Sequence, residues 1–122
     1  PVPMTLTRTG TIIGTPAYMS PEQHRGEVAA ASSDQFSFCV SLYQGLYGLI
    51  PYPTESLEAL RHAVLQGIVT PAPIRSKVPP RIFAALRRGM MSDPAQRFGS
   101  MTELLAALER WSAWRALRRA AG

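Results

Sequence analysis

Residues 14–23 read Gly-Thr-Pro-Ala-Tyr-Met-Ser-Pro-Glu-Gln, and they pass from a turn-rich loop into the start of a helix. Ser20 is a good N-cap, and Pro21 suits the first helical position, where its missing N–H is harmless. Gln23 stands where a capping-box partner reaches back to the N-cap. The pattern predicts that the loop ahead of the helix is held in place, and such a loop is a candidate surface for function.

A second informative segment, residues 32–43, reads Ser-Ser-Asp-Gln-Phe-Ser-Phe-Cys-Val-Ser-Leu-Tyr. A polar cap leads into a helix that is apolar on nearly every side, which predicts burial all round. Asp34 in the first turn is the unusual residue, because a carboxylate in a core is costly unless several donors hold it. We expect backbone N–H groups of another segment to be those donors, and we interpret Asp34 as a structural helix-start carboxylate.

A third segment, residues 93–98, reads Asp-Pro-Ala-Gln-Arg-Phe and starts with a turn ahead of a helix capped at Ser100. Its Arg97 guanidinium has the geometry to grip a carboxylate with two parallel hydrogen bonds. A carboxylate such as Glu22 is a candidate partner.

In this order and at this separation, the three segments resemble the distal part of the C-terminal lobe of a bacterial eukaryotic-type Ser/Thr protein kinase. Residues 14–23 are similar to the end of the activation segment, with Ser20-Pro21-Glu22 in place of Ala-Pro-Glu. Residues 34–39 are similar to the Asp-x-Trp/Tyr-Ser-x-Gly start of the central buried helix, with Phe36 as the aromatic and Cys39 where the family usually has Gly. Arg97 is similar to the arginine that pairs with the Glu of Ala-Pro-Glu, so the resemblance implies that Glu22 and Arg97 form a buried structural ion pair between the activation segment and the base of the lobe. The resemblance runs from about Thr7 to Arg110.

The resemblance implies roles for the loop before the first helix. Thr15 would reach the catalytic Asp and help to place the acceptor hydroxyl. Pro16, Ala17 and Tyr18 would shape the pocket for the residue that follows the phosphorylated Ser or Thr. Thr7 and Thr9 resemble autophosphorylation sites, with Thr9 the preferred one, since a phosphate can order a loop by pairing with arginine. The plainer interpretation of these two threonines is a solvated Thr-rich loop.

The sequence contains no Gly-rich phosphate loop, no His-Arg-Asp and no Asp-Phe-Gly, the motifs that carry phosphoryl transfer. We therefore expect no catalytic, ATP-binding or metal residue in this chain, and ATP and Mg²⁺ are implied only for the complete domain. The chain starts at Pro1 without Met, which favours a fragment that begins inside the activation loop and is inactive alone. Two alternatives stay open: a fragment of a pseudokinase that acts as a protein-binding module, and a free-standing basic helical binding module.

The net charge of +5 is concentrated at the end of the chain. Four of the 13 Lys and Arg residues follow Glu109, and the other nine against eight acids leave a charge of +1. Residues 111–122 are therefore interpreted as a basic tail, whose Trp111 and Trp114 among arginines allow contact with an anionic membrane surface. We expect two kinds of partner: protein substrates with Ser or Thr acceptors, and the remainder of the kinase domain. We do not expect nucleic acid as a partner.

A single cysteine excludes an internal disulfide framework and fits a reducing cytoplasmic setting. No signal peptide and no run of eighteen apolar residues is visible in the sequence, although tethering through a segment beyond the C-terminus stays open. His24 and His62 show no metal-ligand spacing and are interpreted as surface or boundary residues.

The fold class expected is mainly α: residues 1–110 as a partial protein-kinase-like domain, the helical half of the C-terminal lobe, within a complete domain that is α+β. Residues 1–13 read as irregular. Helices are predicted over residues 21–25 and 36–47, after a cap at Thr54, from Ile82 to Met90, and from Met101 toward Trp111. The four prolines within residues 70–80 predict an extended connection.

Overall fold

The computed structural model describes residues 5–6, 12–13 and 15–110. The elements follow in the order β1 (Thr5–Leu6), β2 (Ile12–Ile13), the 3-10 helix η1 (Thr15–Tyr18), α1 (Pro21–His24), α2 (Ala31–Tyr47), α3 (Leu57–Gln66), α4 (Pro80–Gly89) and the 3-10 helix η2 (Pro94–Gln96). A further helix covers residues 101–110. The mainly helical fold predicted from the sequence is confirmed.

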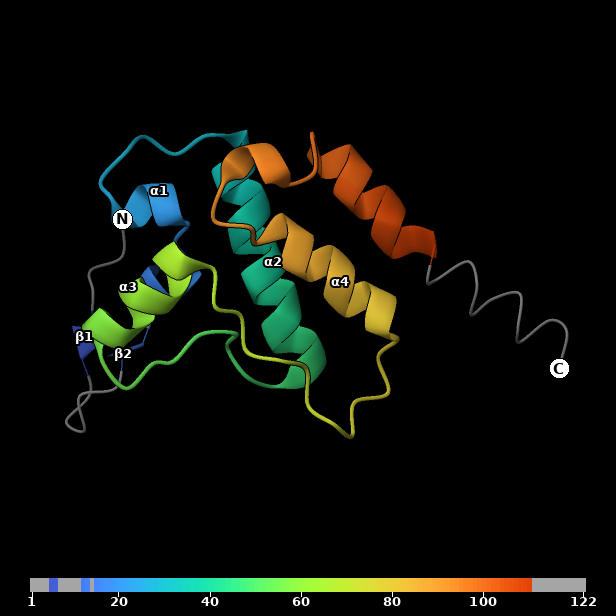
Figure 1. Cartoon of the computed structure of the whole chain (residues 1–122), viewed down its shortest axis with the longest axis horizontal. Coiled ribbons are helices and arrows are strands. Elements are labelled where there is room, and N and C mark those ends of the chain that lie inside the picture. Colours follow the sequence, from blue (N-terminus) through green and yellow to red (C-terminus); the bar gives the residue numbers. More distant parts are fainter. Residues whose placement is uncertain (1–4, 7–11, 14, 111–122) are drawn as a thin grey trace, which may run out of the picture.

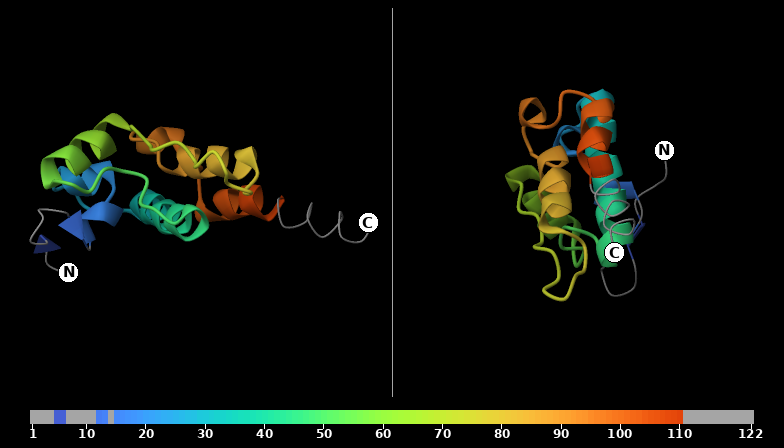
Figure 2. Two further views of the ribbon diagram at one scale, coloured as in Figure 1. Left: turned by 90° about the horizontal axis from the view of Figure 1, so that it is seen from below. Right: turned by 90° about the vertical axis from the view of Figure 1, so that its right-hand side faces the viewer.

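The longest helix, α2, runs through the middle of the molecule, and the other elements are arranged along it (Figure 1). The two strands, α1 and α3 gather at one end, whereas the helix of residues 101–110 lies at the other (Figure 2). Helix α4 packs against α2, and α1 packs against α3. No helix in the described part of the chain has both the length and the apolar character needed to cross a membrane.

The prediction that residues 1–13 are irregular is wrong for four of them. Strands β1 and β2 pair antiparallel, with Thr5 opposite Ile13 and Leu6 opposite Ile12. Three of these four residues are β-branched and suit extended backbone. A run of two residues is too short to show the alternation by which a strand is recognised in a sequence.

Local signals set the helix boundaries. The Gln23 N–H donates to Ser20 Oγ at 3.3 Å, and the Ser20 N–H donates to Gln23 Oε1 at 3.0 Å, which completes the predicted capping box. Helix α2 ends at Gly48, whose φ of 80° lies in the left-handed region that favours glycine. The predicted cap at Thr54 is wrong: Ser56 caps α3 and accepts from the Ala59 N–H at 3.0 Å.

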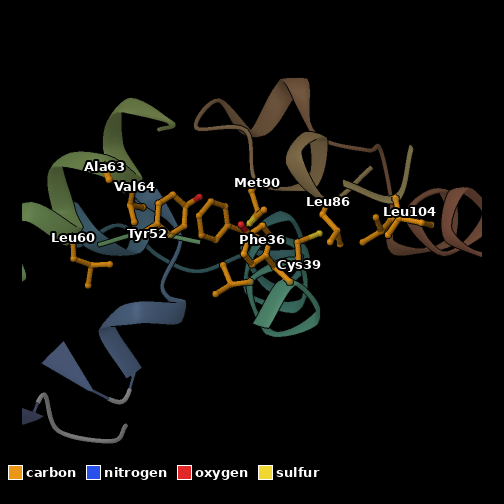
Figure 3. Close-up of a cluster of buried hydrophobic side chains, with 12 residues drawn as sticks. Phe36, Cys39, Tyr52, Leu60, Ala63, Val64, Leu86, Met90 and Leu104 are labelled. Carbon is orange, nitrogen blue, oxygen red and sulfur yellow. The ribbon is translucent and has the colours of Figure 1, made fainter. Parts of the chain in front are cut away.

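The hydrophobic core extends along one side of α2 (Figure 3). Tyr52 lies between the apolar side chains of α3 and Phe36 of α2, and the two rings stack with centroids 6.1 Å apart. Further along α2, Cys39 meets Leu86 of α4, with Leu104 beyond it. The core thus joins α2, α3, α4 and the helix of residues 101–110.

The expectation that α2 is buried all round is wrong for the described chain. Phe36, Cys39 and Tyr43 are fully buried on one side, whereas Phe38 is 37% exposed and Ser41 is exposed on the other. The reason is that α4, Tyr52 and Leu104 all belong to the same core cluster as the buried side of α2. The second side of α2 is an apolar and small-residue surface without cover from the described residues.

Candidate functional site

The loop ahead of α1 forms the 3-10 helix η1 and is fixed against its surroundings by side-chain hydrogen bonds. The Tyr18 hydroxyl donates to Gln44 Oε1 at 2.5 Å, and Ser37 Oγ donates to the Tyr18 carbonyl oxygen at 2.7 Å. His24 Nε2 lies 3.1 Å from the Pro16 carbonyl oxygen. These three bonds reach the loop from α1 and α2, so its conformation depends on tertiary packing.

The four loop residues to which the resemblance gives a role lie together in this turn. Pro16 and Ala17 are buried, and Tyr18 is half-buried. The backbone of Thr15 belongs to the same turn. The structure therefore brings the backbone of all four predicted positions into one short, packed segment.

The carboxylate of Glu22 and the guanidinium of Arg97 form the two-pronged pair expected from the sequence. Arg97 Nη1 donates to Glu22 Oε2 at 2.8 Å, and Nη2 donates to Oε1 at 2.9 Å. Ser33 Oγ adds a third hydrogen bond to Glu22 Oε2 at 2.8 Å. Glu22 is 6% exposed and Arg97 is 2% exposed. The structure thereby joins α1, the first turn of α2 and the η2 segment at one buried point.

Two further donors of Arg97 bind backbone carbonyl groups. Its Nε donates to the Met91 carbonyl oxygen at 2.8 Å, and its Nη1 donates to the Ser32 carbonyl oxygen at 2.9 Å. The guanidinium lies 5.2 Å from the centroid of the Phe36 ring. Because planar guanidinium groups match several acceptors at once, an arginine serves this junction where a lysine would leave acceptors unpaired.

The surroundings of Glu22 stabilise its charged form. Burial by itself raises the pKa of this carboxyl group, but hydrogen bonds from Arg97, from its own backbone N–H and from Ser33 lower it, as does the positive charge of Arg97. The net result is a pKa of about 2. Glu22 therefore carries its negative charge at neutral pH.

Gln35 is a buried polar residue that the sequence interpretation missed. Its Nε2 donates to the Phe98 carbonyl oxygen at 3.0 Å, and the Phe98 N–H donates to its Oε1 at 3.0 Å. The side chain is 1% exposed and satisfies both backbone groups of Phe98. The available signal was its helical spacing with Cys39, four residues later, which places an amide on the buried face of α2.

Asp34 does not lie in the core of the described chain. It is exposed in the first turn of α2, and its carboxylate makes no hydrogen bond to another side chain or backbone group among the described residues. The first turn directs Ser33 and Gln35 inward instead, which leaves Asp34 on the same side of the helix as Phe38 and Ser41. The interpretation of Asp34 as a carboxylate entering this core is therefore wrong, while a partner from another segment stays a prediction.

Several other predicted positions fall outside the described part of the structure, namely Thr7, Thr9 and the whole of residues 111–122. The side chain of Thr15 is likewise outside it. Among residues 5–6, 12–13 and 15–110, no group of three His, Cys, Asp or Glu side chains has the arrangement of a metal site. His62 is exposed on α3 and His24 is half-buried.

A fixed loop before a capped helix, held to a helical base by a buried Glu-Arg pair, defines the chain as part of the C-terminal lobe of a protein kinase. The sequence is 36% identical over 93 residues to serine/threonine-protein kinase PksC of Streptomyces coelicolor, covering 75% of this chain and 17% of the relative. It is 35% identical over 107 residues to serine/threonine-protein kinase PknD of Mycobacterium tuberculosis, covering 84% of this chain and 16% of the relative. It is also 36% identical over 104 residues to tyrosine-protein kinase MasK of Myxococcus xanthus, covering 84% of this chain and 16% of the relative.

The chain belongs to the family of bacterial eukaryotic-type Ser/Thr protein kinases and corresponds to the distal part of their C-terminal lobe. It spans 16–17% of the length of these curated relatives. No family model matches the sequence.

Proposed function

We propose that this chain supplies the substrate-positioning loop and the helical base of a kinase that transfers the γ-phosphate of ATP to Ser or Thr residues of proteins. In this proposal Thr15 helps to place the acceptor hydroxyl, and Pro16, Ala17 and Tyr18 shape the pocket for the following residue. The observation that supports it is the anchoring of this loop, by hydrogen bonds from α1 and α2 and by the adjoining Glu22–Arg97 pair. Preorganised positioning is the main protein contribution to phosphoryl transfer.

The proposal assigns ATP, Mg²⁺ and the catalytic base to the remainder of the kinase domain, so the isolated chain is expected to be inactive. The uncovered side of α2 supports this division. Phe38 and Asp34 both lie there, exposed, on a helix whose other side is fully packed. We expect the remainder of the domain to cover this side and to provide the backbone N–H groups that hold Asp34.

The wider setting is also a proposal. We expect the complete protein to act in the cytoplasm on protein substrates, and we expect the basic residues of 111–122 to favour an anionic membrane surface. Deletion of residues 111–122 would then abolish binding to vesicles that contain anionic lipid. Retained binding would remove this part of the proposal.

The loop assignment is tested in the complete protein with ATP, Mg²⁺ and a protein substrate that offers Ser and Thr acceptors. Thr15→Ala is expected to lower kcat/KM on the order of 10²-fold, because the acceptor hydroxyl loses a positioning contact. Thr15→Ser keeps the hydroxyl and is the matched control, with most of the activity retained. Equal activity of both variants would contradict the role of Thr15.

The same assay separates the alternatives. Absence of phosphate transfer by the unsubstituted complete protein would favour the pseudokinase. A sharp, cooperative thermal transition of the 122-residue chain alone would favour an independent basic binding module, whereas dye-binding apolar surface would favour a part of a larger domain.

A further inference from the structure

We propose that His24 is a positioning residue, which fixes the backbone of the loop 15–18 by donating from Nε2 to the carbonyl oxygen of Pro16. The inference rests on the proposed function of this loop and adds to it a residue that had no assigned role. The Nε2 and Pro16 oxygen atoms lie 3.1 Å apart. The bond joins the last residue of α1 to the second residue of η1.

The helix that carries His24 is restrained ahead of this residue. Helix α1 is held at its start by the Ser20–Gln23 capping box, and its Glu22 is fixed by Arg97. His24 follows Glu22 by two residues on this short, restrained helix. Its ring therefore has a rigid base from which to hold the loop.

A second bond ties the same residue to α3. Arg61 Nη2 donates to the His24 carbonyl oxygen at 3.1 Å. His24 thus accepts from α3 through its backbone and donates to the loop through its ring. The result is a continuous connection from α3, through the end of α1, to Pro16.

The protonation chemistry permits the bond in either form. The neutral ring donates when its proton is on Nε2, and the imidazolium carries a proton on both nitrogens. Burial and the charge of Arg61 lower the pKa of His24, and the hydrogen bond to Pro16 raises it, with burial the largest cause and a net value below the usual one. The neutral ring with Nε2–H is therefore the form expected at pH 7.

The loop has few other restraints at this point. The Pro16 carbonyl oxygen accepts only one further hydrogen bond among the described residues, from the Met19 N–H within the same turn at 3.4 Å. The other two tertiary bonds to the loop both reach Tyr18. Loss of the His24 bond would therefore release the turn at Pro16, while Tyr18 would stay bound to α2.

The test measures hydrogen exchange of the backbone amides of this chain within the complete protein. His24→Ala is expected to accelerate exchange of the Met19 amide roughly three- to tenfold, the range for loss of one hydrogen bond. His24→Gln places an amide donor near the position of Nε2 and is expected to restore slow exchange. His62→Ala removes an exposed histidine from α3 and serves as the matched control, with no change expected.

Equal exchange of Met19 in all four proteins would overturn the proposal. Faster exchange throughout the chain in His24→Ala, including the buried Val40 amide of α2, would also overturn it, because His24 would then stabilise the whole fold rather than position the loop.

The functional consequence is measured separately in the complete kinase. His24→Ala is expected to raise KM for the protein substrate roughly three- to tenfold, while KM for ATP and Tm stay unchanged. For His24→Gln, KM for the protein substrate is expected to stay near that of the unsubstituted protein. Altered Met19 exchange with an unchanged substrate KM would overturn the positioning role. An unsubstituted protein that transfers no phosphate would remove the proposed function, while the exchange experiment would still decide the His24–Pro16 contact.

Discussion

At the scale of single residues, Glu22 and Arg97 show how a buried charge pair is made stable. Taking two charges out of water costs several kcal/mol for each ion, and their attraction repays this only when further hydrogen bonds complete the site. Here Ser33 donates to the carboxylate, and two backbone carbonyl groups accept from the guanidinium. The pair is therefore well compensated, and removal of one partner would leave the other charge buried without its match.

The pH dependence of folding should reveal this pair. The pKa of Glu22 is about 2 in the folded chain, below its ordinary value of 4.5, so the carboxylate contributes stability that is complete above about pH 4.5. That contribution is lost as the pH falls from 4.5 through 2, and it amounts to roughly 3 kcal/mol. Unfolding by denaturant at pH 6 and pH 2 measures it, with Glu22→Gln as the control that lacks this titration. The stability difference between the two proteins should shrink by about that amount at pH 2; a constant difference would contradict the assignment.

Whether the role of a buried polar residue could be predicted from the sequence depended on whether its partner is a side chain or a backbone group. Glu22 and Arg97 are complementary side chains, so the sequence offers Glu22 as one candidate partner, and the family resemblance selects it. Gln35 and His24 bind backbone groups of Phe98 and Pro16, and a backbone group leaves no mark in the sequence. Their roles therefore emerge only from the tertiary arrangement.

At the scale of elements, α2 and α4 pack closely because Cys39 of α2 faces a glycine, Gly89, on α4. Cys39 occupies a position of α2 where glycine would leave more space, and it faces Gly89 at the end of α4. A Cβ atom added at position 89 would overlap Cys39 Sγ. The burial of Cys39 raises the pKa of its thiol to about 12, which suits a packing residue and not a nucleophile.

This contact gives a prediction about packing. Gly89→Ala is expected to destabilise the fold by about 1–3 kcal/mol, because the interior must absorb an extra methyl group against sulfur. Cys39→Ala in the same chain removes the sulfur and should recover most of that loss. Denaturant unfolding of the two single variants and the double variant gives the coupling between the sites.

The matched control for this prediction is Gly45→Ala in α2. A Cβ atom at position 45 meets no atom within 4 Å, and the site is exposed. Alanine should therefore stabilise the helix there by roughly 0.5–1 kcal/mol.

The prediction for Gly89 would be contradicted if the effects of Cys39→Ala and Gly89→Ala on the free energy of unfolding were additive, because the two side chains would then not compete for the same space.

The helices themselves were largely predictable, whereas their surroundings were less so. Apolar spacing identified α3 and α4, and the capping box at Ser20 fixed the start of α1. The pairing of β1 with β2 was missed, since it involves two residues on each strand. Which side of α2 is exposed was not predicted, because an apolar sequence does not reveal which of its sides the neighbouring elements reach.

At the scale of the whole molecule, α2 connects a loop with a proposed functional role to a helical base. Its Ser37 and Gln44 hold the loop, its Phe36 and Cys39 belong to the core, and Gln35 binds the η2 side of the structure through Phe98. The Glu22–Arg97 pair closes this arrangement across 75 residues of sequence. The central claim is therefore that the ion pair supports activity through the stability of the assembled lobe.

The most direct test of this claim is to measure Tm and phosphate transfer together for Arg97→Ala in the complete protein. Removal of the guanidinium strands the Glu22 carboxylate in the interior at a cost of roughly 3–5 kcal/mol. We predict that Tm falls and that activity falls with it, with activity recovering as the temperature is lowered into the range where the variant is folded. An unchanged Tm with lost activity would contradict the account, because Arg97 would then act directly in the reaction and not through the fold.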